Sequence, residues 1–292
     1  MTDSILNAEA GGSDALAFVW VTVLVTVAAA VRGVWSPCGL SMISAINPFT
    51  ERSRRNRYWL TALWFIAGSV LGGAMLGGLA AIGAALWGSL PASVAVTAGI
   101  ACVGCLVAAA SDSSTFGFGL PGHPRQVNEQ WLDRYRRWVY ACGFGVQIGV
   151  GFATYIMTAA VYLTVLLGAL SGSPAMAFAV GLLFGLVRGL AVLLSSRARD
   201  PGALRMLHRR LDQLAPWSLR AAIAVETAGA AVLGHAAAGP VGLALVAVPV
   251  ATVLVLGCSR SWRRHHESSA PDPRPQPDAP VDRYCPVPTH RR

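Results

Sequence analysis

The chain has 292 residues, of which 54% are hydrophobic and 13% charged, with a formal net charge of +9. No charged side chain occurs in residues 58–111 or 138–187. Each run is long enough for two crossings of a hydrocarbon layer, at about 20 apolar residues per crossing. This composition excludes a soluble domain and predicts an all-α, polytopic bundle of membrane helices.

Runs of glycine, serine and proline at 88–91, 171–174 and 239–240 divide the apolar sequence into candidate helices. The last division is needed because one helix over 218–258 would be far too long for a bilayer. The sequence therefore predicts seven membrane-spanning helices, which cover residues 15–35, 58–87, 92–110, 138–170, 175–195, 218–237 and 241–258.

The predicted transmembrane domain, residues 15–258, lies between two different tails. Residues 1–14 carry acidic but no basic side chains, unlike the positively charged start of a secretory signal. The first helix is therefore predicted to be retained, with 1–14 as an extracytoplasmic tail. Residues 259–292 are rich in proline and arginine and are predicted to form a disordered cytoplasmic tail.

The positive charge is distributed as a membrane topology requires. All 23 basic residues are arginine. Cytoplasmic connections carry an excess of basic residues, so the clusters indicate an extracytoplasmic N-terminus and a cytoplasmic C-terminus in the cytoplasmic membrane. The expected surroundings are a lipid bilayer, and no nucleic-acid partner is predicted. Twenty of the arginines lie in every second connection or the tail, at 52–57, 125–137, 197–210 and 260–292.

The two parts of the domain show a weak internal similarity. Residues 15–110 and 138–238 each provide three predicted helices, and 241–258 is an additional helix. The first helix of the first part is interrupted by Pro37, and the first helix of the second part is similarly overlong and contains Gly149 and Gly151. Three crossings per unit predict an inverted repeat, in which broken helices at matching positions mark a site near the midplane. The second helix of each part has central glycines, which also suit simple helix packing: Gly68, Gly72 and Gly73, then Gly181, Gly185 and Gly189.

The first interruption carries the motif Ser36-Pro37-Cys38-Gly39-Leu40. A proline frees backbone groups, so a broken span survives only where protein or a water-filled cavity covers it. Cys38 then lies where a new helix would begin, with Arg32 nearby, and both features favour a reactive thiolate. The alternative is a buried cysteine that only packs.

This motif, just past a first span, resembles the Ser-Pro-Cys-x-Leu motif of the CcdA/DsbD membrane thiol–disulfide carriers. The resemblance implies inverted three-helix repeats with one redox cysteine in the first helix of each. It also implies transfer of reducing equivalents between thioredoxin-like proteins on the two faces, as in cytochrome c maturation. The sequence departs from the family at Ser41, where proline is usual, and at 152–155, which lacks the second cysteine. The same architecture serves exporters of the LysE-like superfamily.

Cys102 and Cys105 lie on one face of the third predicted helix. Small residues surround them, which favours a packing role. A carrier without its usual second cysteine still needs a resolving thiol, because disulfide exchange passes through a mixed disulfide. Either cysteine is therefore the predicted resolving thiol if Cys38 is the exchanging one.

Arg188 and Glu226 are charged residues inside the fifth and sixth predicted helices. Each charge in lipid costs at least about 2.5–3.5 kcal/mol, so such residues usually pair or mark a pathway. Because the helices are consecutive and antiparallel, we expect the two side chains to form an ion pair, which either pins the helices or serves transport.

Three functions remain open from the sequence. The leading hypothesis is a membrane thiol–disulfide oxidoreductase with Cys38 as the exchanging thiol and thioredoxin-like partners on one or both faces. The second is a secondary transporter of a metal ion or small solute, and the third is a membrane scaffold or assembly subunit. No nucleotide or metalloprotease motif occurs, and we predict no cofactor and no bound metal.

Overall fold

The computed structural model describes residues 2–113, 135–152 and 158–268, with side chains placed from residue 12 to 248 inside these ranges. The chain divides into a large unit, Met1–Val253, and a second unit, Leu254–Arg292. The large unit contains the membrane bundle. Part of the region 152–155, where the CcdA/DsbD resemblance places a cysteine, and most of the predicted tail lie outside the described residues.

The described residues are helical, with no strand. Five of these helices are long and apolar enough to cross a membrane, so the predicted all-α membrane bundle is confirmed. The helices are α1 (Thr2–Arg32), α2 (Pro37–Ala45), α3 (Pro48–Ser53), α4 (Tyr58–Gly88), α5 (Val94–Asp112), α7 (Arg137–Val150), α8 (Ala160–Leu170), α9 (Pro174–Leu190) and α10 (Pro201–Ser268), with the 3-10 helices η1 (Gly33–Trp35) and η2 (Ala191–Arg197).

Three helix boundaries differ from the sequence-based expectation. Helix α1 begins at Thr2, so the predicted N-terminal tail is helical. Helix α10 begins at Pro201 and not at the expected residue 218. At its start Asp200 accepts a hydrogen bond from the Ala203 N–H, and Leu211 packs into the core. It also continues to Ser268, into the segment expected to be disordered. Hydropathy locates apolar spans, but it does not reveal helices that extend beyond them.

The expected division near 239–240 is present as a bend. Ala238 and Gly239 leave the helical conformation, and Gly239 has a φ of 59°. This left-handed conformation suits glycine because it has no Cβ. The chain then turns back, so that Val246 is buried and packs next to Gly234. The predicted sixth and seventh helices are therefore two arms of α10.

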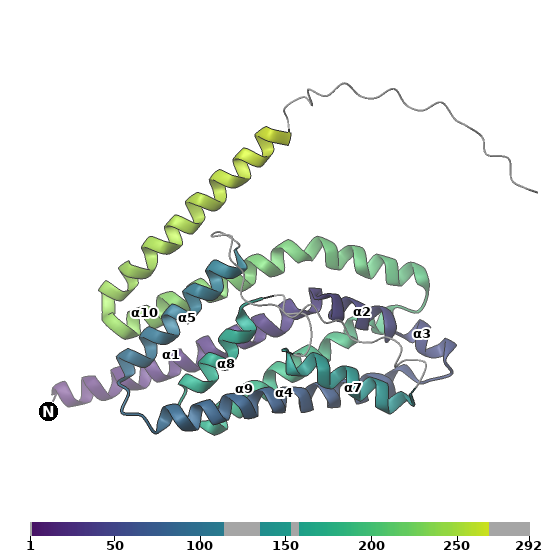
Figure 1. Cartoon of the computed structure of the whole chain (residues 1–292), viewed down its shortest axis with the longest axis horizontal. Coiled ribbons are helices and arrows are strands. Elements are labelled where there is room, and N and C mark those ends of the chain that lie inside the picture. Colours follow the sequence, from purple (N-terminus) through teal and green to yellow (C-terminus); the bar gives the residue numbers. More distant parts are fainter. Residues whose placement is uncertain (1, 114–134, 153–157, 269–292) are drawn as a thin grey trace, which may run out of the picture. The chain divides into compact units, whose positions relative to one another are not determined.

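Helix α4 is the central packing element of the bundle, with α7 and α9 against it (Figure 1). A Cβ on Gly73 would lie 2.7 Å from the Cα of Gly185, closer than real Cβ contacts. The hydroxyl of Ser69 donates a 2.8 Å hydrogen bond to the Gly185 carbonyl. The central glycines therefore allow α4 and α9 to meet backbone to backbone, as in other membrane bundles.

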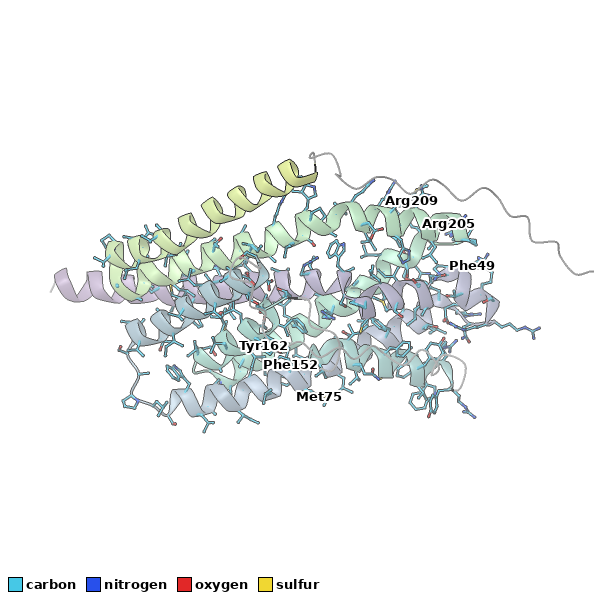
Figure 2. The ribbon with its side chains drawn as sticks, turned by 45° about the horizontal axis from the view of Figure 1, so that its top comes forward. Phe49, Met75, Phe152, Tyr162, Arg205 and Arg209 are labelled. Carbon is cyan, nitrogen blue, oxygen red and sulfur yellow. The ribbon has the colours of Figure 1, made fainter. Side chains whose placement is uncertain are left out.

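One end of the bundle carries the arginine-rich connections; Phe49, Arg205 and Arg209 lie there together (Figure 2). The fully buried Glu51 of α3 fixes this end. Its carboxylate accepts hydrogen bonds from Thr61 of α4 at 2.6 Å and from Tyr140 of α7 at 2.8 Å. Helices α3, α4 and α7 are thereby joined through one satisfied carboxylate, a feature that the sequence did not indicate.

Candidate functional site

The first helix is broken at the predicted position. Helix α1 ends at Arg32, η1 follows, and Ser36 adopts an extended conformation before α2 begins at Pro37. The Ser36 hydroxyl accepts a 3.1 Å hydrogen bond from the Gly39 N–H. Serine at the N-cap and proline at the first helical position form a strong helix-start signal. They place Cys38 in the first turn of α2, where it is 1% exposed.

The second half contains a matching break, because the predicted helix 138–170 is two helices. Helix α7 ends at Val150, and Gly151 has a φ of 75°, which favours glycine. Helix α8 begins only at Ala160. Phe152 and Tyr162 lie side by side across the break, with ring centroids 5.3 Å apart (Figure 2). The predicted first and fourth helices are therefore both discontinuous, and the inverted repeat itself stays a prediction.

Helix α9 connects the two breaks. The ring of Phe184 lies against Gly151, and a Cβ there would be 3.1 Å from the ring. One turn further on, the guanidinium of Arg188 lies above the same ring, 5.7 Å from its centroid. That guanidinium fills the space beside Gly33, and it interacts electrostatically with Cys38. The cation therefore lies inside the bundle beside Gly33, within electrostatic range of the Cys38 thiol.

The expected ion pair between Arg188 and Glu226 is absent. Arg188 is 4% exposed, and among the described residues no carboxylate forms an ion pair with it. Neither carboxylate oxygen of Glu226 has a hydrogen-bond partner. The two helices are neighbours in sequence, but their charged side chains face different partners. The prediction was wrong because it fixed the depth of each residue and not its direction around the helix axis.

The separation of these charges has a measurable consequence. Residues without shared partners usually have additive effects, within about 0.3–0.5 kcal/mol. The Arg188→Ala and Glu226→Ala losses of unfolding free energy should therefore add in the double variant. Thermal or denaturant unfolding of the three purified variants checks this. If the double variant were clearly more stable than the sum of the two single losses predicts, Arg188 and Glu226 would have to interact with each other.

Glu226 belongs to a second buried cluster, between α1, α5, α8 and α10. It interacts electrostatically with Asp112, and Asp112 with Arg32. Asp112 also accepts hydrogen bonds from the Thr158 hydroxyl and, at 2.7 Å, from the Ala159 N–H. It therefore caps α8 at the second break. Sequence reasoning missed Asp112, although it is the first charge after the uncharged run 58–111.

Arg32 itself lies at the other side of this cluster. One of its guanidinium nitrogens donates a 3.0 Å hydrogen bond to the hydroxyl of Ser218 in α10. It is the last residue of α1, directly before the first break. The carboxylates therefore lie beside both discontinuous helices.

Cys102 and Cys105 contact α10. The Cys102 thiol donates a 3.2 Å hydrogen bond to the Ala230 carbonyl, and Cys105 is fully buried and interacts with Glu226. None of the four cysteines in the described part of the chain, Cys38, Cys102, Cys105 and Cys142, forms a disulfide. The resolving role of either cysteine stays a prediction.

A cavity of about 540 Å³ opens at the other end of the bundle, near the turns that follow α4 and α8. Its lining includes Asp14 and Trp87 but not Cys38, Arg188 or Glu226. No group of three potential metal ligands occurs in the described residues.

Two proteins with known roles are similar to this chain. One is the methylamine utilization protein MauF of Paracoccus versutus, 28% identical over 205 residues, which are 63% of this chain and 68% of that protein. The other is MauF of Paracoccus denitrificans, 31% identical over 183 residues, 58% of this chain and 62% of that protein. No protein-family model and no solved structure matches the chain.

Proposed function

We propose that this membrane protein serves methylamine utilization by thiol–disulfide exchange at Cys38. The metabolic role follows the names of its two Paracoccus relatives. The chemistry follows the residues at the first break. We further propose an extracytoplasmic N-terminus, because the arginine-rich connections then face the cytoplasm.

One observation carries the chemical proposal: among the described residues, no carboxylate forms an ion pair with the buried Arg188. A buried cation without a counter-charge is costly. The thiol of Cys38 lies within electrostatic range of this guanidinium. A thiolate is the nucleophile of disulfide exchange, and a nearby cation favours that form of a thiol. The position of Cys38 in the first turn of α2 adds the partial positive charge of a helix N-terminus.

The exchange balances with two thiol proteins as partners. The Cys38 thiolate attacks a disulfide of the acceptor protein, forms a mixed disulfide and releases one acceptor thiolate. A thiolate of a dithiol donor protein then attacks the Cys38 sulfur and releases the second acceptor thiolate. The other donor thiol closes the donor disulfide and frees Cys38. Two electrons pass from donor to acceptor, and the two protons of the donor thiols match those taken up by the acceptor.

The decisive experiment compares two single-cysteine variants in a host that lacks the native gene. Cys38→Ser should abolish growth on methylamine, while Cys142→Ser, the matched thiol control, should sustain it. Trapping with an alkylating reagent should reveal a mixed disulfide with a thioredoxin-like protein in the wild type, and none in Cys38→Ser. Variants of Cys102 and Cys105 test the predicted resolving thiol. Removing a thiol that resolves the Cys38 mixed disulfide should make that disulfide accumulate, whereas direct attack by the donor protein would leave its amount unchanged.

Growth of Cys38→Ser at the wild-type rate, together with failure of Arg188 or Glu226 variants, would overturn this proposal. That outcome would favour the transporter, for which the unpartnered Glu226 is the supporting observation. Loss of growth without any trapped disulfide would also contradict thiol exchange. It would leave the assembly role as the explanation.

A further inference from the structure

We infer that Glu226 and Asp112 form a proton-binding carboxyl pair inside the bundle, in which Glu226 holds the proton. This site does not depend on the chemistry of Cys38. It rests on the geometry of one fully buried carboxyl group, one half-buried carboxyl group and one cation, and its ligand is a proton.

Glu226 is fully buried, and neither of its oxygens has a hydrogen-bond partner. The groups that interact with it are Asp112 and the thiol of Cys105, both on α5. Neither supplies a positive charge. An ionised carboxylate in this position would be a buried anion beside another acid, which is the least favourable arrangement for two carboxyl groups.

Asp112 is placed differently, although it belongs to the same cluster. It accepts hydrogen bonds from the Thr158 hydroxyl and the Ala159 N–H, at the N-terminus of α8. It also faces Arg32 of α1, which is the cation of the cluster. These donors stabilise an ionised Asp112. The cluster is electrically neutral when Asp112 and Arg32 are charged and Glu226 carries a proton.

Both helix breaks lie next to residues of the cluster that holds this proton. Asp112 caps the helix that follows the second break, and Arg32 is the last residue of α1 before the first. Loss of the proton would place a second negative charge beside Asp112, so the contacts that Asp112 makes at both breaks would have to rearrange. Proton binding would thereby control the broken helices.

The chain contains its own control in Glu51, which is also fully buried. The Glu51 carboxylate accepts hydrogen bonds from Thr61 and Tyr140 and lies 3.7 Å from Arg54. It should be ionised, since its charge is satisfied. Two buried glutamates in one bundle should therefore differ in protonation.

Dicyclohexylcarbodiimide provides the test, because this apolar reagent modifies protonated carboxyl groups in membrane interiors. Full-length protein in detergent is treated at neutral pH, and the modified residue is mapped by mass spectrometry. We expect an adduct on Glu226 and none on Glu51. The adduct should be lost in Glu226→Gln and retained in Glu51→Gln. Cys38→Ser should be modified like the wild type, so failure of the thiol proposal would leave this one standing.

The influence of Asp112 on the protonation of Glu226 is tested with Asp112→Asn. Without the neighbouring carboxylate, which disfavours a negative charge on Glu226, Glu226 should ionise more readily, so its modification should fall. Infrared spectra check protonation without the reagent. The carbonyl band of a protonated carboxylic acid should be present in the wild type and absent only in Glu226→Gln. An adduct on Glu51 or Asp112 in place of Glu226, or the absence of both adduct and band, would overturn the inference.

Discussion

Replacement of Gly73 by leucine should prevent the bundle from assembling. A Cβ at this position would lie 2.7 Å from the Cα of Gly185, and the obstacle is backbone, which has no alternative rotamer. Overpacking commonly costs about 1–3 kcal/mol when side chains can move aside. We expect a larger loss here because α4 and α9 would have to separate. Yield of monodisperse protein and its thermal unfolding temperature measure the effect.

Gly78 of the same helix is the matched control, since nothing lies within 4 Å of a Cβ there. Gly78→Leu should fold like the wild type, because leucine is a better helix former than glycine and meets only open space. If Gly73→Leu and Gly78→Leu lowered the yield and the unfolding temperature equally, α4 and α9 would not pack through Gly73.

The second large effect is expected from Gly33→Ala. The methyl group would occupy the position of the Arg188 guanidinium, so the cation would have to leave the thiol of Cys38. The guanidinium is the end of a flexible side chain and can shift, so we expect a cost within the range of about 0.5–3 kcal/mol for contacting residues. We therefore expect loss of the Cys38 reaction with a small maleimide and a lower unfolding temperature. Both are measured on the purified protein.

The same methyl group should be far less harmful in an Arg188→Ala background, where the space beside Gly33 is empty. Contacting residues show coupling energies of about 0.5–3 kcal/mol. The double-mutant cycle of Gly33→Ala and Arg188→Ala should give a coupling energy at the upper end of this range. Gly99→Ala, on a helix face with no neighbour within 4 Å, controls for the general effect of the substitution. Equal costs of Gly33→Ala in both backgrounds would show that Arg188 does not occupy this place.

Several features followed from the sequence because their causes are local. Uncharged runs such as 58–111 cannot remain in water, and they predicted the membrane helices that α4 and α5 confirm. The Ser36-Pro37 pair carries its own helix-start signal, which placed the first break correctly. Gly239 likewise supplied the backbone freedom for the bend in α10.

The partners of the buried charges were decided only by the tertiary structure. Counting residues from the helix ends placed Arg188 and Glu226 at similar depths and suggested an ion pair, yet Arg188 lies beside Gly33 and Glu226 near Asp112. Successive residues of an α-helix turn by about 100°, so the direction of a side chain depends on how the whole helix is rotated against its neighbours. That rotation is set by long-range packing, such as the contact of Gly73 with Gly185. A linear pattern of hydrophobicity does not contain it.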